Sequence, residues 1–381
     1  GRVLAMAASP GYDANLFEPT NYNNSLLNEL LNDADQPLVN RATQGQYPLG
    51  SVFKVVTFSA ALESGLFLPE TTLDCQYEWR GLPDRILYDW TWEKCQEAVQ
   101  AGEFCNSSKN TPSGLLTLPE GIMRSCNPWF WQIGLDLYNF DRGSDIANMA
   151  RSFGFGAPTG IDQISEAPGQ ITDPPSLLDA VNQAVGQGDV LVTPLQVATM
   201  IAAVGNGGTL YRPQVIEEIQ PIEGDPTVVF KPEARDTLPL RAENLEVLQE
   251  ALISVVQNPR GTANFRLRGM DFPAAGKTGT AESGSVTGDP HAWFAGYTYC
   301  ADKADEYPVC ENKPDIAVAV IVENIGDGSE YGAPIFRRMI QAHYFGTPQS
   351  LFWWEANFGV PRTPTPIGGI PTKTPKPRND D

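Results

Sequence analysis

The pattern of apolar and polar positions predicts a layered α/β arrangement. Alternating or clustered β-forming residues predict strands over residues 1–8, 272–283, 291–299 and 315–323. The last two strands flank a polar loop and read as a hairpin, and a final helix is expected over about 333–345. One strand, a long helical middle, then strands and a packing helix predict a mixed α/β sheet beside an all-helical lobe.

Two helix starts in the middle of the chain carry clear signals. Thr117-Leu-Pro-Glu120 and Thr193-Pro-Leu-Gln196 are both capping boxes with proline in the first turn. The second of these helices should stop at the glycine-rich residues 205–208, and the final helix at Gly346.

One apolar run contains a lysine with no charged neighbour. Residues 51–62 read SVFKVVTFSAAL, with apolar residues on every side of a helical wheel, which predicts a helix buried all round. Lys54 would then lose water around its ammonium group, and burial favours the neutral amine. Ser51 lies three residues earlier on the same helix face and in the first turn. A hydroxyl beside a desolvated amine is a nucleophile beside its base.

Short motifs of this kind need support from elsewhere in the chain. Ser-x-x-Lys alone also describes a surface serine followed by a lysine whose charged end reaches water. Ser125-Cys126-Asn127 opens an aromatic helical run, and Lys277-Thr278-Gly279 lies in a strand-like segment that ends in a turn. Alone, the first is typical of a cap or turn and the second of a strand end. Together and in this order, the trio is the signature of β-lactamases and penicillin-binding proteins.

The resemblance extends over nearly the whole chain. The sequence resembles the transpeptidase domain of class B penicillin-binding proteins in residues 1–15 and in YPLGSVFK, GFGAPTGID, PRGTANF, GKTGTAE and HAWFAGY. It departs from the family at Leu49, where a second proline is usual, at Cys126, and in a longer cysteine-bearing insert at about 66–116. The resemblance implies the penicillin-recognising fold, a central antiparallel sheet flanked by helices plus an all-helical lobe, over residues 1–346.

The resemblance also implies acyl transfer through a serine ester. Ser51 would attack the carbonyl of a D-alanyl-D-alanine stem-peptide terminus, and neutral Lys54 would accept its proton. Ser125 would relay a proton between Lys54 and the leaving nitrogen. Asn127 would hold Lys54 and the substrate amide, and Lys277 would contribute positive charge.

Substrate binding is implied for the residues around the third motif. Thr278 and Thr280 would bind the terminal carboxylate, and Gly279 would let the substrate backbone approach the strand. The backbone N–H groups of Ser51 and Thr280 would form the oxyanion hole. β-Lactams would be covalent inhibitors, and a glycosyltransferase of the elongation or division machinery is an expected partner.

Two other readings share these motifs. A hydrolase of the same fold, either a D,D-carboxypeptidase or a β-lactamase, would differ in how fast water clears the acyl-enzyme. A non-catalytic β-lactam sensor or divisome scaffold would need no turnover. The block-by-block match favours the transpeptidase, while its role in elongation, division or sporulation stays open.

Charge and composition narrow the chemistry further. The 381 residues carry a formal net charge of −20, which argues against nucleic acid as a partner. Only two histidines occur, His291 and His343, which leaves little material for a Ser-His-Asp triad or a histidine-rich metal site. We therefore expect no metal and no cofactor.

Six cysteines are consistent with an oxidising compartment. Cys300 and Cys310 flank the polar loop of the hairpin and are the first predicted disulfide. Cys75 and Cys105 bracket much of the insert and are the second predicted pair. Cys95 is then left over, and Cys126 would be a small buried apolar residue beside the site.

The ends of the chain also carry expectations. No stretch of 18 or more apolar residues occurs, so nothing in the sequence predicts a membrane span. The resemblance implies an N-terminal membrane anchor and a non-catalytic pedestal outside this chain, with the catalytic domain on the extracytoplasmic face. Residues 347–381 become rich in proline and threonine, which predicts a disordered tail.

Overall fold

The computed structural model describes residues 1–20, 24–284, 288–301, 303–311, 313–349 and 352. It divides into two compact units, residues 1–336 and 337–381, and each is treated by itself. Apart from residues 347–349 and 352, the predicted tail at 347–381 lies outside the described residues. The functional motifs all lie in the first unit.

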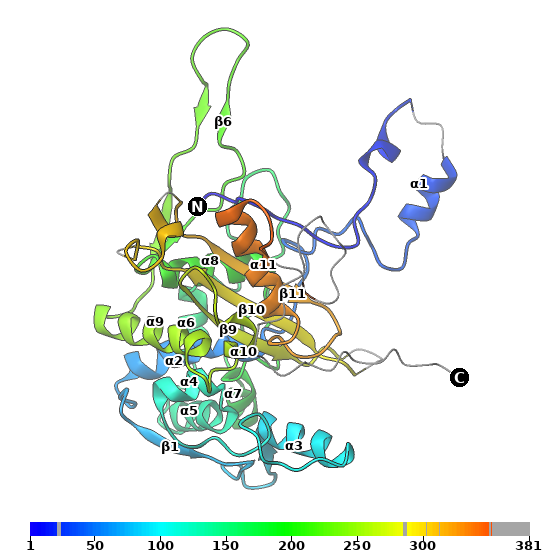
Figure 1. The fold of residues 1–381 in the computed structure, drawn as a ribbon. Coiled ribbons are helices and arrows are strands. Elements are labelled where there is room, and N and C mark those ends of the chain that lie inside the picture. Colours follow the sequence, from blue (N-terminus) through cyan, green and yellow to red (C-terminus); the bar gives the residue numbers. More distant parts are fainter. Residues whose placement is uncertain (21–23, 285–287, 302, 312, 350–351, 353–381) are drawn as a thin grey trace, which may run out of the picture. The chain divides into compact units, whose positions relative to one another are not determined.

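The main sheet has three antiparallel strands in the order β11-β10-β9 (Figure 1). These are β9 (Ala274–Ala281), β10 (His291–Thr298) and β11 (Ala317–Val322), which confirms the three predicted C-terminal strands and the hairpin. All eight residues of β10 are buried, as expected of a central strand that is covered on both faces. Among the strands in the described residues, β9 pairs only with β10, so its other edge can meet other parts of the site.

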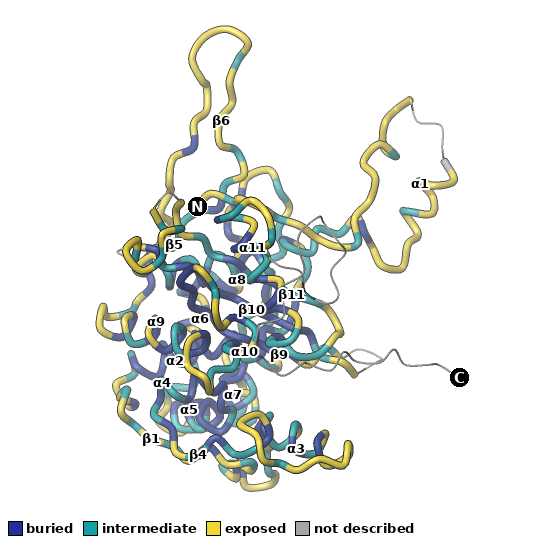
Figure 2. The backbone as a smooth tube through the Cα atoms, in the orientation of Figure 1, coloured by how far each residue is buried: buried dark blue, intermediate teal, exposed yellow. Residues whose placement is uncertain are grey.

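The buried helix at the first motif is confirmed. A 3-10 turn, η2 (Gly50–Phe53), leads directly into α2 (Lys54–Ser64), and residues 54–62 are all buried. Gly65 ends the helix in the left-handed conformation, with φ of 72°. Figure 2 shows α2 inside the most deeply buried part of the chain, with α4, α5 and strands β9 and β10.

The rest of the helical part surrounds α2, which packs against α4, α5, α6 and α9. Both predicted capping boxes are present, at Thr117 before α4 and at Thr193 before α8, and α8 ends at Gly205 as expected. The remaining bounds are α4 (Leu118–Arg124), α5 (Asn127–Asn139), α6 (Asp145–Ser152), α7 (Leu177–Gln183), α8 (Pro194–Gly205), α9 (Ala242–Gln257) and α10 (Asn264–Leu267). The final helix, α11 (Gly332–Phe345), also agrees with the sequence and begins in the first unit.

Short elements complete the described chain. The insert holds β1 (Thr72–Cys75), β2 (Glu78–Trp79), β3 (Leu87–Tyr88), α3 (Trp90–Gln100) and β4 (Gly114–Thr117), with β1 paired to β4 and β2 to β3. Elsewhere lie α1 (Asn24–Leu31), β5 (Thr209–Tyr211), β6 (Glu218–Ile219), β7 (Val228–Val229), β8 (Ala234–Thr237), η1 (Ala14–Phe17) and η3 (Pro308–Glu311). Figures 1 and 2 show the β6–β7 hairpin and the α1 segment projecting from the body as largely exposed chain. In the described chain, no helix has both the length and the apolar character that a bilayer span requires.

The strand predicted over residues 1–8 is wrong. Only Arg2 forms a β-bridge there, to Gln214, and its side chain is paired with Glu217 at 2.6 Å. Most residues of the segment are exposed, so its apolar side chains gain little by pairing into a sheet. The alternating pattern therefore marks an extended segment that lacks a partner along most of its length.

Of the two predicted disulfides, one is confirmed and the other is wrong. Cys300–Cys310 is confirmed, but Cys75 is bonded to Cys126 and Cys105 to Cys95. The predicted Cys75–Cys105 pair fails because β1 pairs with β4, and β4 runs straight into α4 and the second motif. This topology brings Cys75, the last residue of β1, to Cys126 rather than to the loop that contains Cys105.

The two disulfides of the insert should contribute unequally to stability. Replacing both Cys75 and Cys126 by alanine should lower the free energy of unfolding by about 4 kcal/mol, because that bond closes a loop of 51 residues. The matched double replacement of Cys95 and Cys105, which opens a loop of 10 residues, should cost about 3 kcal/mol. Urea unfolding measures both, and a larger loss in the second variant would contradict the loop-closure argument.

Candidate active site

The three sequence motifs meet at a pair of buried lysines. Lys54 Nζ donates to the Ser125 carbonyl oxygen at 2.8 Å and to Asn127 Oδ1 at 2.5 Å, and it lies 3.4 Å from Ser125 Oγ. Lys277 Nζ lies 2.9 Å from the same Ser125 Oγ and donates to the Thr278 carbonyl oxygen, also at 2.9 Å. The Ser125 hydroxyl therefore stands between two amines, each contributed by a different motif.

The second motif occupies the sharp turn between α4 and α5. Ser125 caps α4 in the left-handed conformation, with φ of 55°, which is unfavourable for a residue with a side chain. Cys126 follows as the N-cap of α5, and Asn127 and Pro128 open that helix. The turn directs the Ser125 hydroxyl and the Asn127 amide to the same amine.

Burial sets the protonation of the first lysine. Lys54 is fully buried, and loss of hydration lowers its pKa to about 7 from an ordinary value of 10.5. The negative charge of Asp89 acts in the opposite direction but is the smaller effect. At neutral pH a substantial fraction of Lys54 is therefore the free amine, which can accept a proton.

Burial acts on the second lysine as well. Loss of hydration lowers the pKa of Lys277 well below its ordinary value, and the nearby charge of Lys54 lowers it further. Two ammonium groups that share one hydroxyl repel each other, so protonation of one disfavours protonation of the other. The positive charge expected of Lys277 is thus linked to the state of Lys54.

Ser51 is more accessible than the two lysines. It is partly exposed, as are Asn127 and Thr280, whereas Lys54 and Lys277 are enclosed. Ser51 stands in the first turn of η2, where backbone N–H groups have no partner inside the helix. Among the described residues its hydroxyl has no hydrogen bond, so its oxygen is not engaged by the protein.

Glycine at position 50 brings this turn against the third motif. Its φ is 55°, and a Cβ there would lie 2.4 Å from the Thr280 carbonyl oxygen. Only a glycine lets η2 touch the free edge of β9 at this point. The backbones of Ser51 and Thr280 are consequently neighbours, as an oxyanion hole made from both requires.

Gly279 is enclosed by the protein itself. A Cβ at this position would come within 2.9 Å of Val52 and of the Trp293 Cβ, and 3.1 Å from the Leu49 carbonyl oxygen. The turn before the nucleophile thus packs directly on the strand. This gives a structural reason for glycine here, and close approach of a substrate backbone stays a prediction.

The threonines of the third motif have partners that the sequence alone did not identify. Thr278 Oγ1 lies 2.7 Å from Thr262 Oγ1, a residue of the PRGTANF block. Thr280 Oγ1 donates to Asp327 at 3.4 Å, and Asp327 is paired with Lys94 of the insert at 3.0 Å. The only available signal was the resemblance of the PRGTANF block to the family, which pointed to Thr262 but gave it no role.

Comparison with known proteins agrees with this geometry. The family description "Penicillin binding protein transpeptidase domain" matches residues 1–341. The chain belongs to this family. Among named relatives, the peptidoglycan D,D-transpeptidase PbpA of Mycolicibacterium smegmatis is 32% identical over 357 residues, covering 90% of this chain and 64% of that protein. MrdA of Haemophilus influenzae is 28% identical, covering 89% of this chain and 50% of its own length. Both are class B penicillin-binding proteins. The chain spans 64% of the first and 50% of the second.

Solved structures of the same family share the fold. A structure titled "Structural coordination of polymerization and crosslinking by a peptidoglycan synthase complex" matches with a TM-score of 0.74 and 31% identity. The match covers 92% of this chain and 55% of the other. The predicted penicillin-recognising α/β fold is thus confirmed for this transpeptidase domain.

A buried carboxylate beside the second motif was missed from the sequence. Asp89, at the N-cap of α3, accepts from the Asn127 backbone N–H at 2.9 Å. Its other oxygen accepts from the Thr91 hydroxyl at 2.7 Å and the Thr91 N–H at 3.2 Å. Burial raises the pKa of Asp89, while these bonds and Lys54 act against the rise. No local pattern distinguishes Asp89 from an ordinary capping aspartate.

Asp89 also lies among atoms of the kind that bind metals. Ligand-type atoms of Cys75, Asp89 and Cys126 all lie within 4.8 Å of one another. Metals bind thiolates, however, and the two sulfurs are bonded to each other. The arrangement is therefore a disulfide beside a hydrogen-bonded carboxylate, and the expectation of no metal stays a prediction.

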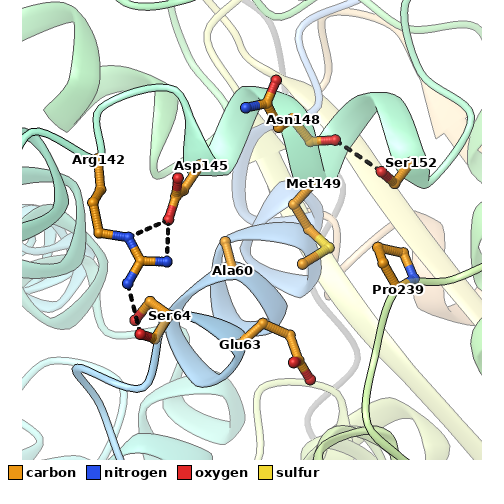
Figure 3. A pocket seen from close by; sticks show the side chains of 9 residues that line it. All are labelled: Ala60, Glu63, Ser64, Arg142, Asp145, Asn148, Met149, Ser152 and Pro239. Atoms are coloured by element: carbon orange, nitrogen blue, oxygen red, sulfur yellow. Dashed lines mark hydrogen bonds and ion pairs between the residues drawn. The ribbon is translucent and has the colours of Figure 1, made fainter.

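A surface hollow of about 190 Å³ lies elsewhere on the domain (Figure 3). It is lined by Ala60, Glu63 and Ser64 of the second half of α2 and by residues of α6, whereas the lysine cluster is at the start of α2. Arg142, its main cation, is bound to Asp145 at 2.6 Å and to the Ser64 carbonyl oxygen at 2.6 Å. The charge of Arg142 in the hollow is therefore already paired. The hollow has no role in the chemistry described above.

The protonation of Lys54 can be measured without any substrate. In protein labelled at lysine ¹³Cε, one resonance should titrate near pH 7, because burial destabilises the ammonium form. The Lys54→Met variant should lack that resonance, and its Lys277 resonance should titrate at a higher pH than in the wild type, because the nearby charge of Lys54 is lost. A Lys54 resonance that titrates near 10.5 would contradict the assignment of this amine as a base.

Proposed function

We propose that this domain is a peptidoglycan D,D-transpeptidase that cross-links stem peptides through an acyl-enzyme on Ser51. One observation carries the proposal. The fully buried amine of Lys54 is bonded to Ser125 and Asn127 of the second motif, and Lys54 follows the accessible Ser51 by three residues. The names of the relatives support the same activity. Because the chain covers only part of each relative, substrates and partners belong to the proposal.

The acylation step uses both buried amines. Ser51 Oγ attacks the carbonyl carbon of the penultimate D-alanine, and its proton passes to neutral Lys54. The carbon–nitrogen bond to the terminal D-alanine then breaks, and the leaving nitrogen takes a proton. Ser125 Oγ lies 2.9 Å from Lys277 Nζ and 3.4 Å from Lys54 Nζ, and it would relay that proton. Asn127 holds Lys54 and would bind the substrate amide.

The negative charge of the tetrahedral intermediate would be held by the backbone N–H groups of Ser51 and Thr280. Such donors are each worth about 10²–10³ in rate, because they are already oriented before the charge develops. The contact of Gly50 with the Thr280 carbonyl oxygen supports this pairing. Thr278 and Thr280 would bind the terminal carboxylate of the donor stem, with Lys277 as the nearby cation.

The second step transfers the acyl group. An amine from a neighbouring stem attacks the ester carbonyl, its proton leaves through the Ser125–Lys54 path, and Ser51 Oγ departs with a proton. The same ester could be cleared by water, which is the hydrolase alternative. The partly exposed Ser51 admits either nucleophile, so the lifetime of the ester distinguishes the two.

The setting of the domain is also part of the proposal. The relatives support a domain that works on the extracytoplasmic face of the membrane, held by an anchor outside this chain. Among the structural neighbours, one belongs to a complex of polymerisation and cross-linking, which supports a glycosyltransferase as partner. β-Lactams, which resemble the D-alanyl-D-alanine terminus, would acylate Ser51. The net charge of −20 argues against nucleic acid as a partner.

Intact mass after incubation with a penicillin tests the nucleophile. The wild-type chain should gain one penicillin mass and keep it for hours, whereas Ser51→Ala should gain none. Ser64→Ala, at the far end of α2, is the matched control and should react like the wild type. An adduct that disappears within seconds would support the hydrolase alternative, and an unreactive wild type would support the scaffold alternative.

Acylation should also depend on pH in a defined direction. Since only the neutral amine accepts the Ser51 proton, the acylation rate constant should rise about tenfold between pH 6 and pH 8 for a base whose pKa is about 7. Stopped-flow measurement with a fluorescent penicillin gives the profile, and thermal melts at each pH control for unfolding. A rate that is flat across this range would exclude Lys54 as the base.

A further inference from the structure

The insert supplies a side chain to the second catalytic motif. Asp89 lies at the end of β3 and the start of α3, both inside the insert, and it is completely buried. One of its carboxylate oxygens accepts from the backbone N–H of Asn127 at 2.9 Å. Asn127 in turn holds Lys54 at 2.5 Å through its side chain. Asn127 thus links Asp89 of the insert to Lys54, the proposed base.

Helix capping explains only half of this contact. The oxygen Oδ2 of Asp89 accepts from the N–H and the hydroxyl of Thr91, as an N-cap residue does. The oxygen Oδ1 points away from α3 and binds the first N–H of another helix, α5. All three partners are donors, which is the environment of an ionised carboxylate. A residue that only caps α3 would need neither the bond to the Asn127 N–H nor a negative charge.

The charges around the lysine cluster come from few groups. Lys54 faces Lys277 of β9, the polar oxygens of Ser125 and Asn127, and the charge of Asp89. Asp89 itself also acts on Arg124, the last residue of α4, and on Glu93 of α3. Asp89 is the anion that opposes the loss of the Lys54 proton.

The other side of the motif is held by a covalent bond. Cys126, which precedes Asn127, is joined to Cys75 of β1, so the insert holds the Cys126–Asn127 segment by a disulfide and by a hydrogen bond. The disulfide fixes where the turn lies, and the hydrogen bond fixes the direction of the Asn127 N–H. The Ser125 backbone, which is strained, is kept in place by both.

We propose that Asp89 is a positioning residue of the transpeptidase reaction: from within the insert, its buried carboxylate orients Asn127, the residue that holds Lys54. The proposal rests on the proposed function. It makes the insert part of the catalytic apparatus, although none of its residues touches the reacting atoms.

Two substitutions separate charge, orientation and capping. Asp89→Asn keeps an oxygen for the Asn127 N–H and removes the charge. Asp89→Ser keeps a good N-cap residue for α3 and is too short to reach Asn127. Asp136→Asn, a partly buried aspartate on α5 that accepts from Gln132, is the matched control. Each variant is measured by Lys54 NMR titration, by the pH profile of penicillin acylation and by thermal melting.

The expected results differ between the variants. Asp89→Asn should lower the pKa of Lys54 and move the acidic limb of the acylation profile down by about half a pH unit or more, because a nearby anion is lost. Asp89→Ser should in addition slow acylation by about tenfold or more at the optimum pH, since Asn127 loses its orientation. Asp136→Asn should leave the titration and the profile unchanged.

Two outcomes would overturn the proposal. If both Asp89 variants melt earlier but keep the wild-type Lys54 titration and acylation rate per folded molecule, Asp89 only caps α3. If Asp89→Asn raises the pKa of Lys54, the charge argument has the wrong sign. If the wild type is not acylated at all, the proposed function fails, while the NMR titration of Asp89→Asn still decides whether Asp89 acts on Lys54.

Discussion

The structure depends on keeping one amine out of water without giving it a carboxylate partner. A carboxylate in direct contact would stabilise the ammonium form of Lys54 and raise its pKa, so the amine would stay protonated at neutral pH. Lys54 is instead bonded to a backbone carbonyl oxygen and a side-chain amide oxygen. These neutral acceptors hold the amine in place and leave its protonation near balance at neutral pH. The apolar run of α2 and the turn between α4 and α5 are the parts of the fold that make this possible.

Much of this arrangement could be predicted because its signals are local. The lone Lys54 in an apolar run indicated its burial, and the capping boxes at Thr117 and Thr193 fixed two helix starts. The hairpin of β10 and β11 followed from two apolar runs and a polar loop. In each case the residues that carry the signal lie within one helix or on the two sides of one loop, and the physics of helices and hairpins acts at that range.

Most of the failures involve contacts between distant parts of the chain, although the missed bond between Cys95 and Cys105 joins residues only 10 apart. Residues 1–8 have the composition of a strand, but only tertiary structure decides whether a partner strand lies beside them. The Cys75–Cys126 bond depends on how β1 pairs with β4, which no spacing rule reveals. Asp89 and Thr262 look like ordinary capping and loop residues until Asn127 and Thr278 are placed against them. The motifs identified the candidate reacting groups, and the fold identified the residues that hold them.

The bond between Cys75 and Cys126 gives the domain a chemical maturation step. Both sulfurs are fully buried and belong to segments 51 residues apart, so β1 must meet the start of α5 before the thiols can be oxidised. A freshly made chain with reduced cysteines would have its second motif tied to the insert only by hydrogen bonds. Formation of this bond requires an oxidising environment. The link between the insert and the second motif thus depends on the redox state of two cysteines as well as on the fold.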